Sequence, residues 1–183
     1  MTGVEIRPAR FDELPAVRDL FVEVVRDLAV YNGRARNAEI GKHSLQHLEA
    51  LHREDPRFIL VAAGPGGLDA FAICRDDDDL LWLSWFGVSQ AARGRGLSTQ
   101  VLSHLRIAAR DMGYWKVWCD ARDTNAPSLR ALERAGFRRV CRLARHWFGQ
   151  DYVFLEMFVD EGDPAGCPGA SAPGHPPPAR FRT

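Results

Sequence analysis

The chain has 183 residues, of which 46% are hydrophobic, so it is long enough to bury the core of one domain. Lysine plus arginine and aspartate plus glutamate both total 24, and this zero net charge argues against a nucleic-acid or anionic-membrane partner. The N-terminal residues show no basic segment followed by an apolar stretch, and no run of about 18 apolar residues occurs, so the sequence predicts a cytoplasmic protein.

The first third of the sequence predicts one strand and two helices. Residues 4–9 indicate a short strand, after which Asp12 offers a side-chain oxygen to cap a helix. Apolar residues then recur at steps of three and four as far as Leu28, which is typical of one buried helix face. The polar residues 32–42 indicate a flexible connector and a candidate lid, and a second helix with leucines at the same spacing ends before Pro56.

The middle of the sequence predicts three strands that form an antiparallel meander. Residues 58–63, 68–75 and 80–89 are apolar runs separated by the turn sequences GPGG and DDDD. A long helix follows over residues 97–112 and ends at Gly113, which can adopt the left-handed conformation of a helix end.

The remaining predicted elements are a strand at 114–121, a helix at 125–135 and two strand-like runs at 137–148 and 151–159. The fold class is therefore α/β in the broad sense of mixed helices and strands (α+β). Two regions are expected, a folded domain over residues 1–160 and a disordered tail over residues 161–183, where Pro, Gly and Ala replace large apolar residues.

Cysteines and histidines give no sign of a metal site. No CxxC pair and no HExxH motif occurs, and the histidines of the second helix are expected at the surface or in an acceptor pocket. The cysteines are expected to be reduced, and those in the strand-like runs to lie in the core. The residues concerned are His43, His47 and His52, and Cys74, Cys119, Cys141 and Cys167.

The segment LSWFGVSQAARGRGLSTQVL contains the most informative feature, a Gly-rich turn between an apolar strand and a helix. Gly94 and Gly96 have no side chain to block a ligand, and the amides and dipole of the helix start favour negative charge. Arg93 and Arg95 add positive charge. The turn therefore predicts phosphate binding, although it matches neither the P-loop GxxxxGK[ST] nor the dinucleotide pattern GxGxxG.

The sequence RGRGLS, preceded by WFGV, resembles the acetyl-CoA signature Q/R-x-x-G-x-G/A of the GCN5-related N-acetyltransferase (GNAT) superfamily. Arg93 and Gly96 fit this pattern, whereas Ser98 departs from its last position. The later segment NAPSLRALERAGF, over residues 125–137, is similar to the second cofactor segment of the family. The resemblance implies a mostly antiparallel central sheet of about seven strands, flanked by about four helices and splayed near the cofactor.

The resemblance also implies where acetyl-CoA, the acyl donor, would bind. Its pantetheine arm would pair with the backbone along Phe86, Gly87 and Val88, and its pyrophosphate would be wrapped by backbone amides of the Gly-rich turn. Asn125 and Ser128 would line the arm near the thioester. The turn residues are Arg93, Gly94, Arg95, Gly96, Leu97 and Ser98.

The catalytic residues depart from the family pattern, because Leu132 stands where many family members have a tyrosine acid. Ser128 or an ordered water is a substitute, and the backbone amide near Val88 is the expected oxyanion donor. No Asp or Glu lies in the strand that ends at Val88, so His146 is the candidate base; the alternative is a structural histidine packed beside Trp147. Trp147 and Trp85 are candidates for contact with the acceptor.

These features predict an N-acetyltransferase that transfers an acetyl group to a primary amine by direct attack, without a metal. The alternatives are a non-catalytic acyl-CoA-binding or sensing module, suggested by Leu132, and an acetyltransferase for protein N-termini or lysines. The predicted partner is a small-molecule or peptide amine rather than nucleic acid or a membrane. The resemblance also implies a homodimer formed through the last strands.

Overall fold

A computed structural model describes residues 3–160 of the chain. It contains seven strands, five α-helices and four short 3-10 helices within these residues. The strands are β1 (Glu5–Pro8), β2 (Ile59–Gly64), β3 (Gly67–Asp77), β4 (Leu80–Val88), β5 (Lys116–Arg122), β6 (Arg138–Leu143) and β7 (Tyr152–Phe158). The helices are α1 (Leu14–Asp27), α2 (Gly33–Lys42), α3 (Leu45–Glu54), α4 (Leu97–Asp111) and α5 (Ala126–Arg134).

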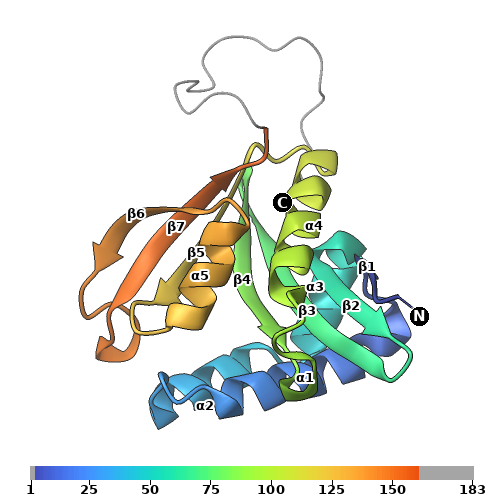
Figure 1. Cartoon of the computed structure of the whole chain (residues 1–183), viewed down its shortest axis with the longest axis horizontal. Coiled ribbons are helices and arrows are strands. Elements are labelled where there is room, and N and C mark those ends of the chain that lie inside the picture. The colour runs from blue at the N-terminus through green and yellow to red at the C-terminus, as the bar shows by residue number, and fades with distance from the viewer. Residues whose placement is uncertain (1–2, 161–183) are drawn as a thin grey trace.

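The seven strands form one sheet in the order β1-β2-β3-β4-β5-β7-β6. All neighbours are antiparallel except β4 and β5, which run parallel and are connected through α4. The mixed fold class, the meander of β2, β3 and β4 and the later strand–helix–strand order are therefore confirmed. Figure 1 shows β4 and β5 at the centre of the molecule, with β6 and β7 beyond them.

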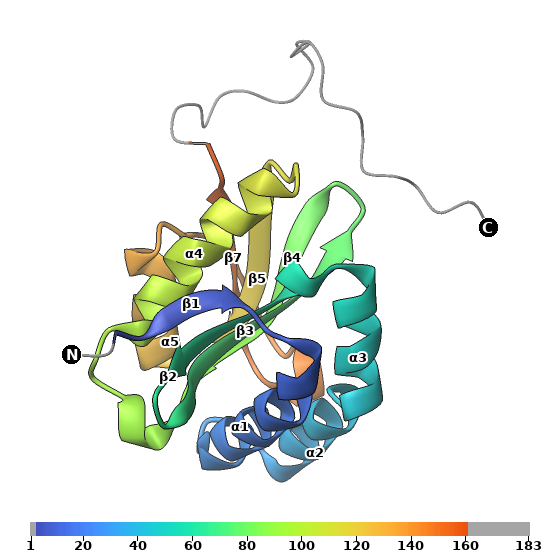
Figure 2. The same ribbon diagram turned by 90° about the vertical axis from the view of Figure 1, so that its right-hand side faces the viewer.

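Helices cover both sides of the sheet. Figure 2 shows α4 and α5 on one side and α1, α2 and α3 on the other. On α1 the expected apolar face is buried, and the Phe21 ring packs edge-on against Phe71 of β3 with ring centroids 6.0 Å apart. Leu102 and Leu105 of α4 are likewise fully buried. Burial of these apolar faces supplies the main free energy of folding and fixes the sheet between two helical layers.

The segment expected to be a flexible connector is helix α2, so that prediction is wrong and the helix count rises to five. Asn32 caps α2, because its side-chain oxygen accepts a hydrogen bond from the Ala35 amide at 2.8 Å. The helix buries only Ala35, and its sequence GRARNAEIGK has no apolar stripe. Hydrophobic periodicity therefore gave no signal for it.

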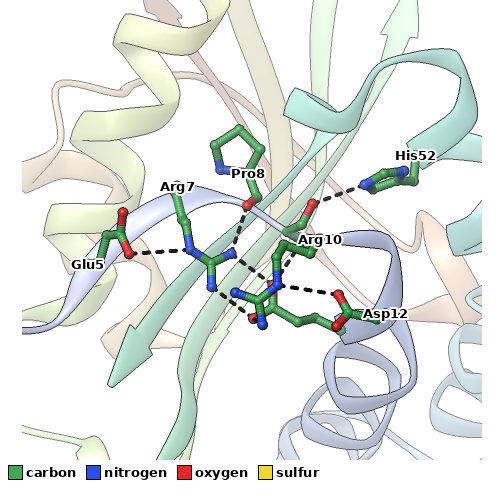
Figure 3. Close-up of polar contacts among 8 residues, drawn as sticks. Glu5, Arg7, Pro8, Arg10, Asp12 and His52 are labelled. Atoms are coloured by element: carbon green, nitrogen blue, oxygen red, sulfur yellow. Dashed lines mark hydrogen bonds and ion pairs between the residues drawn. The ribbon is translucent and has the colours of Figure 1, made fainter. Parts of the chain in front are cut away.

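Asp12 does not cap α1, because it lies inside a 3-10 turn, Phe11–Glu13. Glu13 is the organising residue instead: it accepts the Arg10 amide at 2.8 Å and binds both terminal nitrogens of Arg7 at 2.8 Å. Arg7 and Arg10 both pair with this carboxylate. Figure 3 shows Asp12 bound to Arg10, and His52 nearby, where its Nε2 contacts the Ala9 carbonyl oxygen. The hydrogen bond from Arg7 lowers the pKa of Glu13 to about 2.

The last part of the chain differs from expectation in two respects. The strand expected over residues 137–148 ends at Leu143, because Arg145 and Phe148 adopt left-handed backbone conformations with φ of 49° and 55°. Cys141 on β6 is exposed rather than buried, whereas Cys74 and Cys119 are free thiols in the core as expected. Cys167 and the tail expected over residues 161–183 lie outside the described residues. Within residues 3–160 no helix is both long and apolar enough to cross a membrane.

Candidate active site

Strands β4 and β5 separate soon after they meet. They pair only at Leu81 with Val117 and at Trp82 with Trp118, although β4 continues to Val88 and β5 to Arg122. On its other side β4 stays paired with β3 as far as Val88. The edge of β4 that faces β5 therefore has no strand partner beyond Trp82, which is the splay expected from the sequence.

The Gly-rich turn leads from this splayed strand into α4. Gly94 and Gly96 have φ of 79° and 75°, a left-handed conformation that glycine adopts without strain, and a Cβ at Gly94 would have no atom within 4 Å. Gly96 is the N-cap of α4, so the first free amides of the helix follow it directly. Arg93 forms an ion pair with Asp27 at 2.6 Å, and Arg95 one with Asp69 at 3.0 Å.

A cavity of about 980 Å³ extends along the splay. It collects ten of the predicted cofactor-binding residues from three parts of the chain, namely the end of β4, the Gly-rich turn and the start of α5. These residues are Phe86, Gly87, Val88, Arg93, Gly94, Gly96, Leu97, Ser98, Asn125 and Ser128. Arg95 alone of the predicted set is not in the lining.

The structure fits an elongated acyl-CoA molecule in three ways. The unpaired β4 edge offers backbone groups to an extended arm, the open glycines and free amides suit a pyrophosphate, and the cavity is large enough for a ligand of substantial size. At the start of α5 the Asn125 side chain accepts from the Ser128 amide at 3.4 Å, which holds both residues at the cavity wall.

Two sequence positions that bear on catalysis lie outside the cavity lining. Leu132, at the tyrosine position, is 1% exposed and packs in the core. His146 is exposed and packs on Trp147 with ring centroids 4.5 Å apart. Trp147 and Trp85, by contrast, both line the cavity.

Asp120 is the cavity carboxylate closest in sequence to the splay, and the sequence analysis missed it. It lies on β5 two residues after the last pair with β4, and its Oδ2 accepts a hydrogen bond from Trp147 Nε1 at 2.8 Å. Burial raises the pKa of Asp120, while the Trp147 bond and the nearby His146 partly oppose that rise. The available signal was that Asp120 is the single acidic residue of β5, beside the predicted splay.

Glu39, on the unexpected helix α2, is another carboxylate of the cavity, besides Asp120 and Asp27. Its side chain is 15% exposed and accepts a hydrogen bond from Trp85 Nε1 at 2.9 Å. The same carboxylate pairs with Lys42 at 3.0 Å and lies 3.8 Å from His43 Nδ1. Burial lowers the pKa of His43, which favours the neutral imidazole at neutral pH.

Tyr31 and Tyr152 also line the cavity, and they pack together in one buried cluster. Burial raises the pKa of both phenols, that of Tyr152 to about 12, so both remain protonated at neutral pH. Tyr31 also packs on Trp85 with ring centroids 5.5 Å apart.

The expected histidine positions are distributed over two elements. His43 ends α2, whereas His47 and His52 lie on α3; the first two line the cavity, as acceptor-pocket residues would. Among residues 3–160, no group of three or more His, Cys, Asp or Glu side chains is arranged to hold a metal ion.

Comparison with known proteins shows which family the residues around this cavity match. A family model described as the acetyltransferase (GNAT) family matches residues 22–137, which include the splay, the Gly-rich turn and α5. No curated protein matches the chain in sequence.

Solved structures with the same fold include several acetyltransferases. The ribosomal-protein-alanine N-acetyltransferase of Brucella melitensis is 26% identical, with a TM-score of 0.68 and coverage of 84% of this chain and 99% of that one. YncA of Salmonella typhimurium, solved with its cofactor acetyl-CoA, is 22% identical, with a TM-score of 0.70 over 90% and 99%. PaiA N-acetyltransferase of Thermoplasma acidophilum, in complex with coenzyme A, is 13% identical, with a TM-score of 0.72 over 85% and 99%.

Proposed function

The chain belongs to the acetyltransferase (GNAT) family, and on this premise we propose that it transfers an acetyl group from acetyl-CoA to a primary amine by direct attack. The observation that carries the proposal is the splay of β4 from β5, which opens one cavity from the Gly-rich turn to the Asp120 carboxylate. The predicted cytoplasmic location, the homodimer and the single domain over residues 1–160 remain predictions.

Bound acetyl-CoA would supply a thioester, whose carbonyl carbon forms the new C–N bond as its C–S bond breaks. The free amides at the start of α4 and the left-handed glycines would bind the pyrophosphate, where the positive end of the helix dipole favours an anion. The β4 edge would hold the arm in an extended conformation, and the Val88 amide would donate to the thioester carbonyl oxygen.

Asp120 replaces His146 as our proposed general base. An amine attacks only in its neutral form, and a free amine has a pKa near that of lysine, about 10.4, so a proton must be removed. A carboxylate whose pKa is raised by burial binds that proton more readily than an ordinary aspartate would. Asp120 lines the cavity, whereas His146 does not.

No dedicated acid is required on the leaving side. A thiol has a pKa of about 8.5 and leaves as a thiolate far more readily than an alcohol would leave as an alkoxide. Ser128, on the cavity wall, is an additional hydroxyl donor. The buried Leu132 is therefore compatible with turnover, and the proposal favours an enzyme over a non-catalytic acyl-CoA-binding module.

Two measurements test the proposal. Calorimetric titration of the full chain with acetyl-CoA, with ATP as control, should give saturable binding of acetyl-CoA only. Acetylated product should then form with at least one member of a panel of small amines and peptides. Peptides are included because the 26% identical neighbour is a ribosomal-protein-alanine N-acetyltransferase. Binding without product from any amine would favour the sensing module, and no binding would refute the cofactor site.

A further inference from the structure

We call seven side chains of the cavity wall the acceptor ring; contacts link most of them in series, and Asp120 and Tyr152 lie on the same face of adjacent strands. Its members are Tyr31, Glu39, Lys42, Trp85, Asp120, Trp147 and Tyr152, all of which line the cavity. The ring brings together six elements or turns from four parts of the chain, residues 31–42, 85, 120 and 147–152. Only two of its members, Trp85 and Trp147, had been expected near an acceptor.

The contacts of one half of the ring run through Glu39. Its two carboxylate oxygens have different partners, since Oε2 accepts Trp85 Nε1 at 2.9 Å and Oε1 binds Lys42 Nζ at 3.0 Å. The Lys42 ammonium also lies 5.8 Å from the centroid of the Trp147 ring, within the usual range of a cation–π contact. This half therefore holds an ammonium group between a carboxylate and an aromatic face.

The other half of the ring runs through Asp120. Trp147 donates to Asp120 at 2.8 Å, and Tyr152, which pairs with Arg122 two residues farther along β5, lies on the same face of the sheet. Tyr152 packs with Tyr31 in one buried cluster, and the Tyr31 ring packs on Trp85. The Arg122 guanidinium lies over the Tyr152 ring and is not part of the cavity lining.

Lys42 holds its place in the ring weakly. Its side chain is 59% exposed, and ion pairs of flexible, exposed lysines contribute little to stability. The partner carboxylate is fixed independently of Lys42, because Glu39 is largely buried and bound to Trp85. A ligand ammonium could therefore displace the lysine and find both the carboxylate and the aromatic face already in position.

We propose that the acceptor is an aliphatic di- or polyamine, whose second ammonium group binds between Glu39 and Trp147 in place of the Lys42 ammonium. The reacting amine then lies at the Asp120 side of the ring, gives up its proton there and forms the C–N bond as the thioester C–S bond breaks. This inference rests on the proposed acetyltransferase function and adds the class of acceptor.

The test compares 1,4-diaminobutane with butylamine, which has the same carbon chain and lacks the second amine. A charged hydrogen bond to Glu39 predicts that kcat/KM is about tenfold or more higher for the diamine. In Glu39→Gln, which keeps an oxygen acceptor for Trp85, the diamine preference should fall to about threefold or less through a higher diamine KM.

Two lysine variants distinguish a specific effect of Lys42 in the acceptor ring from the effect of removing any positive charge. Lys42→Met removes the competing ammonium at nearly constant length, so the diamine KM should fall and the preference for the diamine over butylamine should rise. Lys116→Met is the matched control, because Lys116 packs over Trp115 and Trp118 and does not line the cavity. It should leave the diamine preference unchanged. Melting temperatures of all variants show whether each one is folded.

The outcomes distinguish this inference from the proposed function. Equal kcat/KM for the diamine and butylamine, or an undiminished diamine preference in folded Glu39→Gln, would overturn the inference while product formation upheld the enzyme. A peptide with lysine beside its free N-terminus, compared with its norleucine analogue, tests a second source of the same chemistry. A preference for the lysine peptide abolished by Glu39→Gln would support the ring and identify a peptide source. Absence of product from every amine would instead refute the proposed function.

Discussion

Replacing Asp120 by Asn should remove the general base without changing the geometry of the site. Asparagine has nearly the same volume and keeps an oxygen that can accept the Trp147 Nε1 bond, now 2.8 Å long. General bases contribute about 10²- to 10⁴-fold to rate, so kcat should fall by that factor, equivalent to about 3 to 5 kcal/mol of barrier. The affinity for acetyl-CoA, measured by calorimetry, should not change.

The pH profile gives the sharper test. Below its pKa, which burial raises, Asp120 is protonated and cannot accept a proton, so kcat/KM of the wild type should rise with pH as Asp120 ionises. Asp120→Asn should lose this ascending limb and keep only the limb at higher pH that belongs to the amine. Acetylated product is best measured by mass spectrometry, because the exposed Cys141 would also react with thiol reagents.

Stability measurements separate loss of chemistry from loss of folding. A carboxyl whose pKa is raised on folding destabilises the protein once the pH exceeds its unfolded pKa, because a buried charge must then be maintained. Asp120→Asn removes that cost, so at neutral pH it should melt at the wild-type temperature or above. A fall in kcat of less than about tenfold in this folded variant, with the ascending limb intact, would refute Asp120 as the base.

Three further variants test the cofactor site, the packing beneath it and the alternative base. Gly96→Glu, at φ 75°, should weaken acetyl-CoA binding about tenfold or more by placing a carboxylate at the helix N-terminus, whereas Gly113→Glu, at φ 87° on the far end of α4, should not. Gly87→Ala should lower the free energy of unfolding by about 1 to 3 kcal/mol, because its Cβ would lie 2.8 Å from the Phe71 ring. Thermal melting measures this change, and an unchanged melting temperature would contradict the packing. His146→Ala should keep the ascending limb and move it to higher pH, since His146 lowers the pKa of Asp120; a flattened limb would make His146 the base.

Local sequence signals predicted most of the fold. The apolar runs of β2, β3 and β4 are separated by strong turn sequences, and α4 and α5 have both apolar faces and recognisable ends. The Gly-rich turn was equally predictable, because glycine is the residue that adopts a positive φ without strain, as Gly94 and Gly96 do here. The part of the cofactor site that depends on backbone conformation could therefore be predicted from the sequence.

The side-chain part of the site was less predictable, because it is assembled by tertiary packing. Helix α2 is stabilised by the Asn32 cap and by contacts with other elements rather than by an apolar stripe, so Glu39 had been assigned to a connector. Asp120 was visible as an acidic residue within a strand, but its role follows from burial beside Trp147, which lies 27 positions away. No periodicity or motif reports such a pairing.

The distribution of acid and base groups in the cavity matches the unequal difficulty of the two proton transfers. At neutral pH an amine acceptor carries a proton that must be removed before attack, whereas the departing thiol is already acidic enough to leave as an anion. The amine must lose its proton, and the Asp120 carboxylate with its raised pKa lines the cavity to accept it. The thiol needs no acid, and the position of the usual acid is occupied by a core leucine, Leu132. If Asp120→Asn abolishes the ascending limb while Leu132→Tyr adds no rate, the base alone limits this chemistry.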